Sequence, residues 1–139
     1  RFQPGLYVPM APTWGFDNRS VAVRIPSGPN VARRLEHRVA GADANPYLLL
    51  AALLAGIEHG LAGELSPPPP VTGNAYEQFP PSLTNSWCQA LDLLEASEPL
   101  NAALGGDFLG VFLANRRAER DQAMQHVSRL EHDWYLRHV

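Results

Sequence analysis

The spacing of apolar residues changes along this chain and separates a strand-rich beginning from a helical remainder. In Val21–Ile25 apolar residues occupy alternate positions, as on a half-buried strand. Arg33–Val39 is a candidate for its hairpin partner, and the turn-forming stretch Pro26–Asn30 lies between the two. Residues 1–18 are rich in proline, glycine and aromatic side chains, so we expect an ordered loop there.

The longest apolar run begins at Pro46 and predicts a helix that ends near Leu61. Asn45 can accept hydrogen bonds from the first free N–H groups, and proline suits the first helical position. Because the run is apolar almost all round, we expect the helix to be buried centrally. The unbroken apolar part is shorter than the roughly 20 residues that a membrane span requires, which favours a buried helix.

The second half of the chain carries a proline-rich linker and three helical patterns. Residues 66–81 contain four consecutive prolines and predict a stiff, extended linker followed by irregular chain. Apolar residues then recur at helical spacing in stretches that begin near Ser82, Pro99 and Asp107. Ser128 and the glutamate three residues later have the spacing of a capping box, so the last helix is expected to break and restart there.

Together these patterns predict an α+β fold, with an antiparallel β-hairpin over about residues 19–39 followed by a mainly helical C-terminal part. The chain is expected to consist of a loop and hairpin, a buried helix, the linker and a helical segment, over residues 1–40, 41–65, 66–81 and 82–139. The single cysteine, Cys88, excludes an internal disulfide. We expect it to be a small buried side chain, in keeping with a reducing, cytoplasmic compartment.

Charge is distributed unevenly, and the asymmetry locates the candidate chemistry. The formal net charge is −3. Residues 1–40 hold six arginines against two acids, a balance of +4, whereas residues 41–139 hold five arginines against twelve acids, a balance of −7. Every basic residue is arginine, whose planar guanidinium binds phosphate or carboxylate through two hydrogen bonds. The first 40 residues are therefore the candidate anion site.

A stripe of alternating charge lies on the second predicted strand. Residues two apart on a strand share a face, so Arg34, Glu36 and Arg38 point the same way and His37 points to the other side, as a structural histidine. One interpretation is a solvated strand whose charge ladder adds little stability. The other is an anion and metal site, because a carboxylate between guanidiniums stays ionised, as a metal ligand must.

More arginines extend the candidate site. Arg24 points away from the apolar face of the first strand, and Arg19 lies just before that strand. With Arg33, Arg34 and Arg38, up to five guanidiniums are expected to line one surface. Hydrogen bonds of charged groups contribute roughly 1.5–3 kcal/mol each, so converging arginines can hold a polyphosphate firmly.

These residues resemble the catalytic domain of the glutamine synthetase family. The matching motifs are Asn18-Arg19-Ser20 with Arg24-Ile25-Pro26, then Arg33–Arg38, then Ala44–Leu48. The resemblance covers essentially the whole chain and implies the C-terminal part of that domain. The run Glu36–Tyr47 is most similar to the γ-glutamylputrescine synthetase or γ-glutamyl-polyamine ligase branch, which joins glutamate to amines.

The resemblance implies a role for each charged side chain near the ATP phosphates. Glu36 matches a carboxylate ligand of the divalent metal, Mg²⁺ or Mn²⁺. Positions that bind ATP phosphates or stabilise the transferring phosphoryl group correspond to Arg19, Arg24 and Arg34, with Arg19 as the catalytic arginine. The implied reaction phosphorylates the side-chain carboxylate of glutamate, and an amine then displaces phosphate.

The resemblance also implies a substrate site and one departure from the family pattern. Arg1 and Arg38 match arginines that bind glutamate. Ammonia-using members carry a glutamate on a flap where this chain has Tyr7, which favours a larger, polyamine-like amine over ammonia. The family's other metal ligands and its small domain precede Arg1, and its site forms between subunits of a homo-oligomeric ring. Because one carboxylate cannot hold the metals, we expect this segment alone to be inactive.

Two other classes of function compete with a ligase. A member of the family that keeps the fold but serves as a non-catalytic assembly or regulatory protein is one alternative, and the retained charge stripe argues against it. A nucleic-acid-binding module is the other, and the net acidity and the lack of aromatic residues among the arginines argue against it. We therefore expect no nucleic-acid partner and no membrane.

The aromatic pair Trp134–Tyr135 near the end of the chain allows two interpretations. The family's C-terminal segment docks into a neighbouring subunit, and the resemblance implies the same here. Packing within the chain is equally compatible with the pattern.

Overall fold

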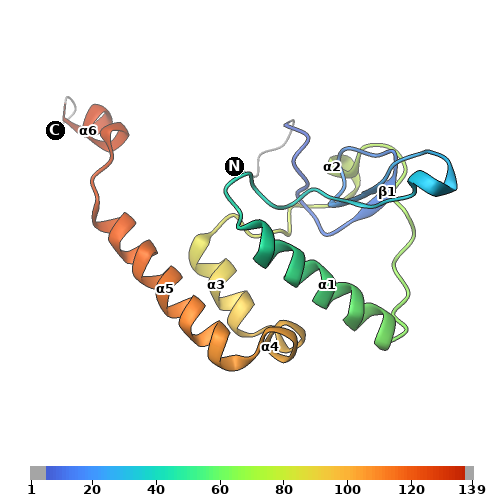
Figure 1. Ribbon diagram of the computed structural model, residues 1–139. Helices are drawn as coiled ribbons and strands as arrows, with labels where there is room; N and C mark the ends of the chain where they lie inside the picture. The colour runs from blue at the N-terminus through green and yellow to red at the C-terminus, as the bar shows by residue number, and fades with distance from the viewer. Residues whose placement is uncertain (1–5, 137–139) are drawn as a thin grey trace. The chain divides into compact units, whose positions relative to one another are not determined.

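The computed structural model describes residues 6–136 and divides into two compact units, 1–85 and 86–139, each of which is considered by itself (Figure 1). The first unit holds β1 (Trp14–Phe16), β2 (Val23–Ile25), the 3₁₀ helix η1 (Asn30–Ala32), β3 (Glu36–His37), α1 (Pro46–Ala62) and α2 (Ala75–Gln78). The second holds α3 (Trp87–Glu95), α4 (Glu98–Leu104), α5 (Gly106–Gln125) and α6 (Arg129–Tyr135). The predicted α+β class, a small sheet followed by a mainly helical part, is confirmed.

The strands form one small sheet in the order β1-β2-β3. β2 and β3 are antiparallel, with Val23 opposite His37 and Arg24 opposite Glu36, as the hairpin prediction requires, although the paired segments are short. β1 pairs with β2 in parallel and lies in the stretch that we expected to be a loop. Three residues that include a glycine are too few to display the alternation that identifies a strand.

The segment after the four prolines runs beside β1. The backbone N–H of Val71 donates to the carbonyl of Trp14 at 2.8 Å, and the indole N–H of Trp14 donates to the carbonyl of Pro68 at 2.6 Å. Gly15 leaves room for this approach, since a Cβ there would lie 2.6 Å from the Val71 carbonyl oxygen. The linker is therefore part of the structure that holds β1 in place.

The core of the first unit lies where this segment meets the start of β2. Val21 is completely buried and packs with Val71 and Ala75. The buried Ser20 hydroxyl accepts a hydrogen bond from the Ala75 backbone N–H at 2.9 Å, which ties the start of α2 to the chain before β2. The loop between β1 and β2 is thus held against Val71 and the start of α2.

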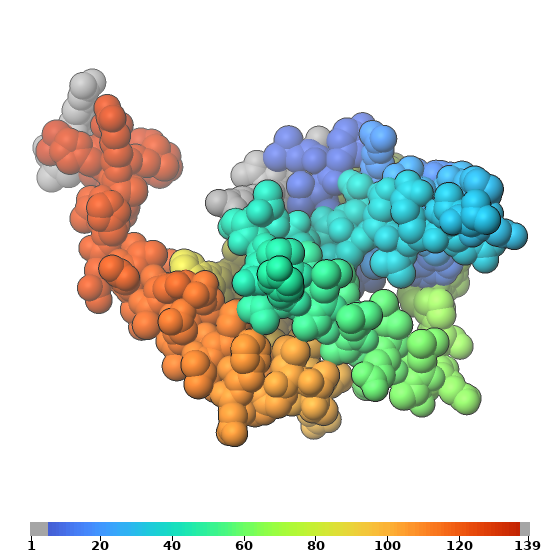
Figure 2. All heavy atoms as spheres, viewed as in Figure 1, coloured from blue at the N-terminus to red at the C-terminus, as the bar shows by residue number. Residues whose placement is uncertain are grey.

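α1 begins as predicted but is not buried. The Asn45 side chain accepts from the first-turn N–H groups at 3.0 and 3.3 Å, and Pro46 opens the helix. Ala55 is buried, but Leu54 and Leu61 are 64% and 74% exposed, and Figure 2 shows much of α1 at the surface. The expectation of central burial is wrong for the described residues, because burying an apolar helix on every side requires elements packed against every side.

The second unit is built on α3 and α5, which lie side by side with α4 joining them (Figure 1). Leu91 of α3 is buried, and so are Leu109 and Leu113 of α5. The predicted helix start at Ser82 is wrong, since α3 begins at Trp87. The backbone N–H of Ser82 instead donates to the carbonyl of Met10, which fixes this stretch as part of the first unit.

The ends of α5 and α6 can be compared with the helix caps that the sequence suggests. Gly105 precedes α5, and Asp107 lies in its first turn instead of capping it. At α6 the predicted capping box is present: the Ser128 hydroxyl accepts from the Glu131 N–H at 3.2 Å, and the Glu131 carboxylate accepts from the Ser128 N–H at 2.8 Å. Hydrogen bonding of the Glu131 carboxylate to Ser128, above all to its backbone N–H, lowers the pKa of Glu131. No helix in the described part of the chain is long and apolar enough to cross a membrane.

Two other expectations in the second unit concern exposure. Cys88 is exposed on α3, which corrects the expectation of a buried thiol, because the buried side of this helix is the one that carries Leu91. Trp134 and Tyr135 are 57% and 61% exposed in the described residues, and docking into a neighbouring subunit stays a prediction for them.

Gly15→Ala is expected to lower the thermal unfolding midpoint of the full-length protein. The new methyl group would press on the Val71 carbonyl, and overpacking of this kind costs roughly 1–3 kcal/mol. Gly56→Ala on α1 is the matched control: its Cβ meets nothing within 4 Å, and an alanine in a helix is more stable by about 0.5–1 kcal/mol. A Gly15→Ala protein that melts at or above the wild-type temperature would contradict the close approach of the two segments.

Candidate functional site

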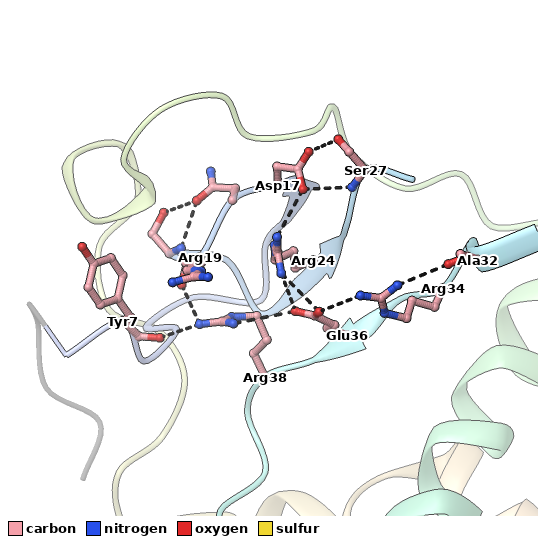
Figure 3. Close-up of polar contacts among 11 residues, drawn as sticks. Tyr7, Asp17, Arg19, Arg24, Ser27, Ala32, Arg34, Glu36 and Arg38 are labelled. Atoms are coloured by element: carbon pink, nitrogen blue, oxygen red, sulfur yellow. Dashed lines mark hydrogen bonds and ion pairs between the residues drawn. The ribbon is translucent and has the colours of Figure 1, made fainter. Parts of the chain in front are cut away.

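Guanidiniums converge on one carboxylate on one face of the sheet (Figure 3). Arg24 on β2 lies opposite Glu36 on β3, and its Nη1 donates to both Glu36 oxygens at 3.1 and 3.0 Å. Arg34 Nη2 lies 3.9 Å from Glu36 Oε1, and Arg38 Nη1 lies 3.9 Å from Glu36 Oε2. The predicted stripe is therefore assembled around Glu36, and we call these four residues the arginine wall.

Arg24 is also held by a carboxylate that sequence reasoning did not single out. Asp17, just after β1, accepts from Arg24 Nη2 at 3.2 Å. The same Asp17 oxygen accepts from the backbone N–H of Ser27 at 2.9 Å, and its other oxygen accepts from the Ser27 hydroxyl. The bonds from Ser27, with a smaller contribution from Arg24, lower the pKa of Asp17. Asp17 was visible in the sequence as one of two acids in the basic first 40 residues.

The guanidinium of Arg24 is correspondingly stabilised in its charged form. The hydrogen bonds to Glu36 are the largest effect and raise the pKa of Arg24. Loss of hydration opposes them, and the charges of Glu36 and Asp17 raise the pKa further. Its side chain is only 18% exposed. Arg24 is therefore a permanent cation that links the ends of β1 and β3 through two carboxylates.

Arg38 ties the arginine wall to two loops. Its Nη2 donates to the backbone carbonyls of Tyr7 and Arg19, both at 2.9 Å. Among the described residues nothing accepts a hydrogen bond from the buried Nε of Arg38 or of Arg24. Backbone carbonyls do not change rotamer, so they hold the Arg38 guanidinium in a single orientation.

The loop that carries Arg19 is held by the side-chain amide of Asn18. Its oxygen accepts from the Ser20 N–H at 2.9 Å and from the Ser20 hydroxyl at 2.6 Å. Its nitrogen donates to the carbonyls of Val71 at 3.2 Å and Gly73 at 2.8 Å. Arg19 lies beside this clamp and borders two neighbouring hollows of about 500 and 390 Å³. Tyr7 and Tyr76 line the smaller hollow.

Not every predicted arginine joins the arginine wall. Arg33 follows η1 outside the strands, and its Nη2 donates to the Asn30 side chain at 2.7 Å, so the alternation of a strand does not apply to it. Arg34 is largely exposed, and its Nη1 donates to the Ala32 carbonyl at 3.3 Å. The expectation that Arg33 lines the same surface as the other arginines is therefore wrong. Arg1 lies outside the described residues.

Glu36 can supply one ligand of a metal ion, and the other ligands would have to come from other residues. Its carboxylate is held among guanidiniums, and its side chain is 31% exposed, so an oxygen ligand is available to a hard divalent cation. Within residues 6–136, however, no group of three or more His, Cys, Asp or Glu side chains is arranged to hold a metal. The chain therefore fits a partial metal site.

His37 lies on the opposite face of the sheet, as the strand pattern predicts. It lines an apolar hollow of about 700 Å³ together with Trp14, Val23, Ile25 and Val39. Loss of hydration on burial lowers the pKa of His37. Its Nδ1 has no hydrogen-bond partner in the part of the chain that the structure describes. The charged side chains around Glu36 therefore lie on one side of β3, and the apolar hollow that His37 lines lies on the other.

The fold and the arginine wall define an α+β domain with guanidiniums clustered around one carboxylate, and comparison with known proteins identifies its family. The glutamine synthetase catalytic domain matches residues 1–135. Gamma-glutamylputrescine synthetase PuuA of Escherichia coli (strain K12) is 43% identical over 139 residues, which are 100% of this chain and 29% of PuuA. Gamma-glutamylethanolamide synthetase GlnA4 of Streptomyces coelicolor is 37% identical over 137 residues, which are 99% of this chain and 29% of GlnA4.

The structural comparison agrees. A solved structure of GmaS in its apo form without ligand superposes with a TM-score of 0.77 and 30% identity, over 93% of this chain and 30% of that one. The chain belongs to the glutamine synthetase family, and it resembles the γ-glutamylputrescine synthetase branch. It spans less than a third of the length of these curated relatives.

The stability of the sheet is expected to decrease below about pH 6.5 because of His37. Its pKa in the folded protein lies below the ordinary value of 6.5, so the unfolded chain binds more protons as the pH falls and unfolding is favoured. Thermal midpoints of the full-length protein between pH 8 and pH 5 should fall more steeply for wild type than for His37→Gln. His59→Gln, at an exposed position on α1, is the matched control for the loss of one histidine. Parallel curves for wild type and His37→Gln would show that His37 is not desolvated.

Proposed function

We propose that the full-length protein that contains this chain is an ATP-dependent ligase that joins glutamate to an amine through γ-glutamyl phosphate. The observation that carries the proposal is the convergence of Arg24, Arg34 and Arg38 on Glu36 in a chain of the glutamine synthetase family. In such a reaction a carboxylate attacks a polyphosphate, so anions approach one another. Fixed cations at this point offset the repulsion and the charge that develops in the transition state.

The proposed roles of the arginines follow from the resemblance and suit their geometry. Arg19 is proposed as the catalytic arginine, which binds ATP phosphate and stabilises the transferring phosphoryl group beside the two hollows. Arg24 and Arg34 are proposed to bind phosphate oxygens from the arginine wall. Arg38, whose guanidinium is anchored by two backbone carbonyls, is proposed to bind the substrate glutamate together with Arg1. An anchored guanidinium loses little freedom when a carboxylate binds, which favours affinity.

Glu36 is proposed as one ligand of Mg²⁺ or Mn²⁺ beside the ATP phosphates. When bound, such a metal polarises phosphoryl oxygens and offsets their charge. The remaining ligands are proposed to come from outside the described residues, because no group of three or more His, Cys, Asp or Glu side chains within residues 6–136 is arranged to hold a metal. We therefore propose that this segment is inactive alone and works within a larger chain, in a homo-oligomeric ring as in the family.

The amine is proposed to be putrescine or a similar polyamine instead of ammonia. Two of the relatives are named for γ-glutamyl products of putrescine and ethanolamine. Tyr7 stands where ammonia-using members carry a flap glutamate, and with Tyr76 it lines the hollow of about 390 Å³. An aromatic ring offers apolar contact to a carbon chain and a face to a cation, where a carboxylate would offer a base for ammonium.

The first test is amine-dependent release of phosphate from ATP. The full-length protein, given glutamate and Mg²⁺, is expected to release phosphate faster with putrescine than with ammonia at equal concentration, because Tyr7 replaces the acidic flap residue. The panel should include ethanolamine, a longer polyamine and ammonia. Release that no member of the panel stimulates would remove the ligase and favour the non-catalytic alternative.

A second test removes the charge of Glu36. Glu36→Gln keeps the size of the side chain but leaves the metal a neutral ligand, and it should reduce metal-dependent turnover about 100-fold or more, the range found when one transition-state contact is lost. Glu58→Gln, at an exposed position on α1, is the matched control and should be neutral. Wild-type turnover by Glu36→Gln at limiting Mg²⁺ would refute the proposed metal role.

A further inference from the structure

A chain of polar contacts leads from the end of β1 to Glu36. Ser27 donates to Asp17 through its backbone N–H and its hydroxyl, Asp17 accepts from Nη2 of Arg24, and Nη1 of Arg24 donates to both oxygens of Glu36 (Figure 3). The two ends of one guanidinium are thus shared between two carboxylates. Asp17 does not touch Glu36 in these contacts and acts on it only through Arg24.

This arrangement matters because a cation approaching Glu36 meets unfavourable charge. Three guanidiniums lie within 4.0 Å of the Glu36 carboxylate, and both of its oxygens already accept from Arg24. A divalent metal has to share these oxygens and tolerate the neighbouring positive charges. Asp17 neutralises one of them and offers Arg24 an acceptor that remains when Glu36 turns its oxygens to a metal.

We propose that Asp17 is a positioning residue for Glu36: it holds Arg24 from the far side and balances its charge, so that Glu36 can bind a divalent cation. The proposal rests on the proposed metal role of Glu36. It assigns no contact between Asp17 and metal or substrate. It predicts that the charge of Asp17, and not only its shape, sets the affinity of the site for cations and for anions in opposite directions.

The local backbone explains why this position suits aspartate. Asp17 has a φ of 47°, in the left-handed region that Asp and Asn tolerate better than other non-glycine residues. Its backbone N–H donates to the Ile25 carbonyl at 3.1 Å, which fixes the residue at the end of the β1–β2 pair. Asp17→Asn therefore keeps the backbone conformation, the size and the oxygen that accepts from Arg24 and the Ser27 N–H; it removes the charge and replaces the other oxygen by an amide nitrogen, to which the Ser27 hydroxyl can turn a lone pair.

The experiment measures two affinities in the full-length protein. Mn²⁺ binding is followed by the electron paramagnetic resonance signal of free Mn²⁺, and ADP binding without metal by calorimetry. Asp17→Asn should weaken Mn²⁺ binding about three- to tenfold, because an unbalanced guanidinium repels the cation, and should strengthen metal-free ADP binding by a similar factor. Glu58→Gln removes an equal charge on α1 and should change neither affinity.

A purely structural role for Asp17 predicts a different pattern. Damage to the fold would weaken the binding of Mn²⁺ and of ADP together, and that result would overturn the proposal, as would two unchanged affinities. Ser27→Ala keeps the charge of Asp17 but removes one of its anchors, so Mn²⁺ binding should weaken about twofold and less than in Asp17→Asn. If Asp17→Asn fails to fold, Ser27→Ala decides: unchanged Mn²⁺ affinity would then overturn the proposal.

Glu36→Gln separates this inference from the proposed function. If Mn²⁺ binding is lost in Glu36→Gln but equal in Asp17→Asn and wild type, the metal role of Glu36 stands and the role of Asp17 falls. If Glu36→Gln binds Mn²⁺ as wild type does, the proposed metal role falls first, and the inference about Asp17 falls with it.

Discussion

The ion pair between Arg24 and Glu36 is the interaction on which the candidate site depends. It exists because β2 and β3 pair in a register that sets these two residues directly opposite each other. A slip of one residue would turn Glu36, with the arginines that flank it, to the apolar face and would set His37 opposite Arg24. The arrangement of Arg34 and Arg38 follows from the same register, since they flank Glu36 along the chain. The register of β2 and β3 therefore determines the geometry of the candidate site.

Gathering cations on so small a sheet has an electrostatic cost, and the chain offsets it in two ways. Carboxylates balance Arg24 from both sides, through Asp17 and Glu36. Arg38 is stabilised by carbonyl dipoles, from Tyr7 and Arg19, which add no negative charge of their own. The surface consequently keeps a net positive character that suits anions, while its cations stay in place when no anion is bound. The phosphate binding proposed for this surface is therefore compatible with side chains that are already held in place when no ligand is bound.

Sequence patterns correctly predicted the features that depend on residues within a few positions of one another. They failed for features that depend on contacts with a distant segment of the chain. Strand alternation placed Glu36 between two arginines, and the helix signal at Asn45 and the capping box at Ser128 were correct, because each involves residues within a few positions. The role of Asp17 depends on Arg24 and Ser27 across a turn. The exposure of Leu54 and Leu61 on α1 depends on which other elements pack against the helix, and the sequence of the helix itself does not contain that information. The resemblance to a family supplied roles for the residues, but not the contacts that support them.

The loop that carries Arg19 requires a side chain at position 18 that both donates and accepts hydrogen bonds. The Asn18 oxygen accepts from the N–H and hydroxyl of Ser20, and its nitrogen donates to two backbone carbonyls, which can only accept. An aspartate has the same outline, but it would set a carboxylate oxygen against the carbonyls of Val71 and Gly73. Isosteric exchange here would thus open the loop by repulsion. A single atom, nitrogen in place of oxygen, decides whether two distant stretches of chain can close around the loop that carries Arg19.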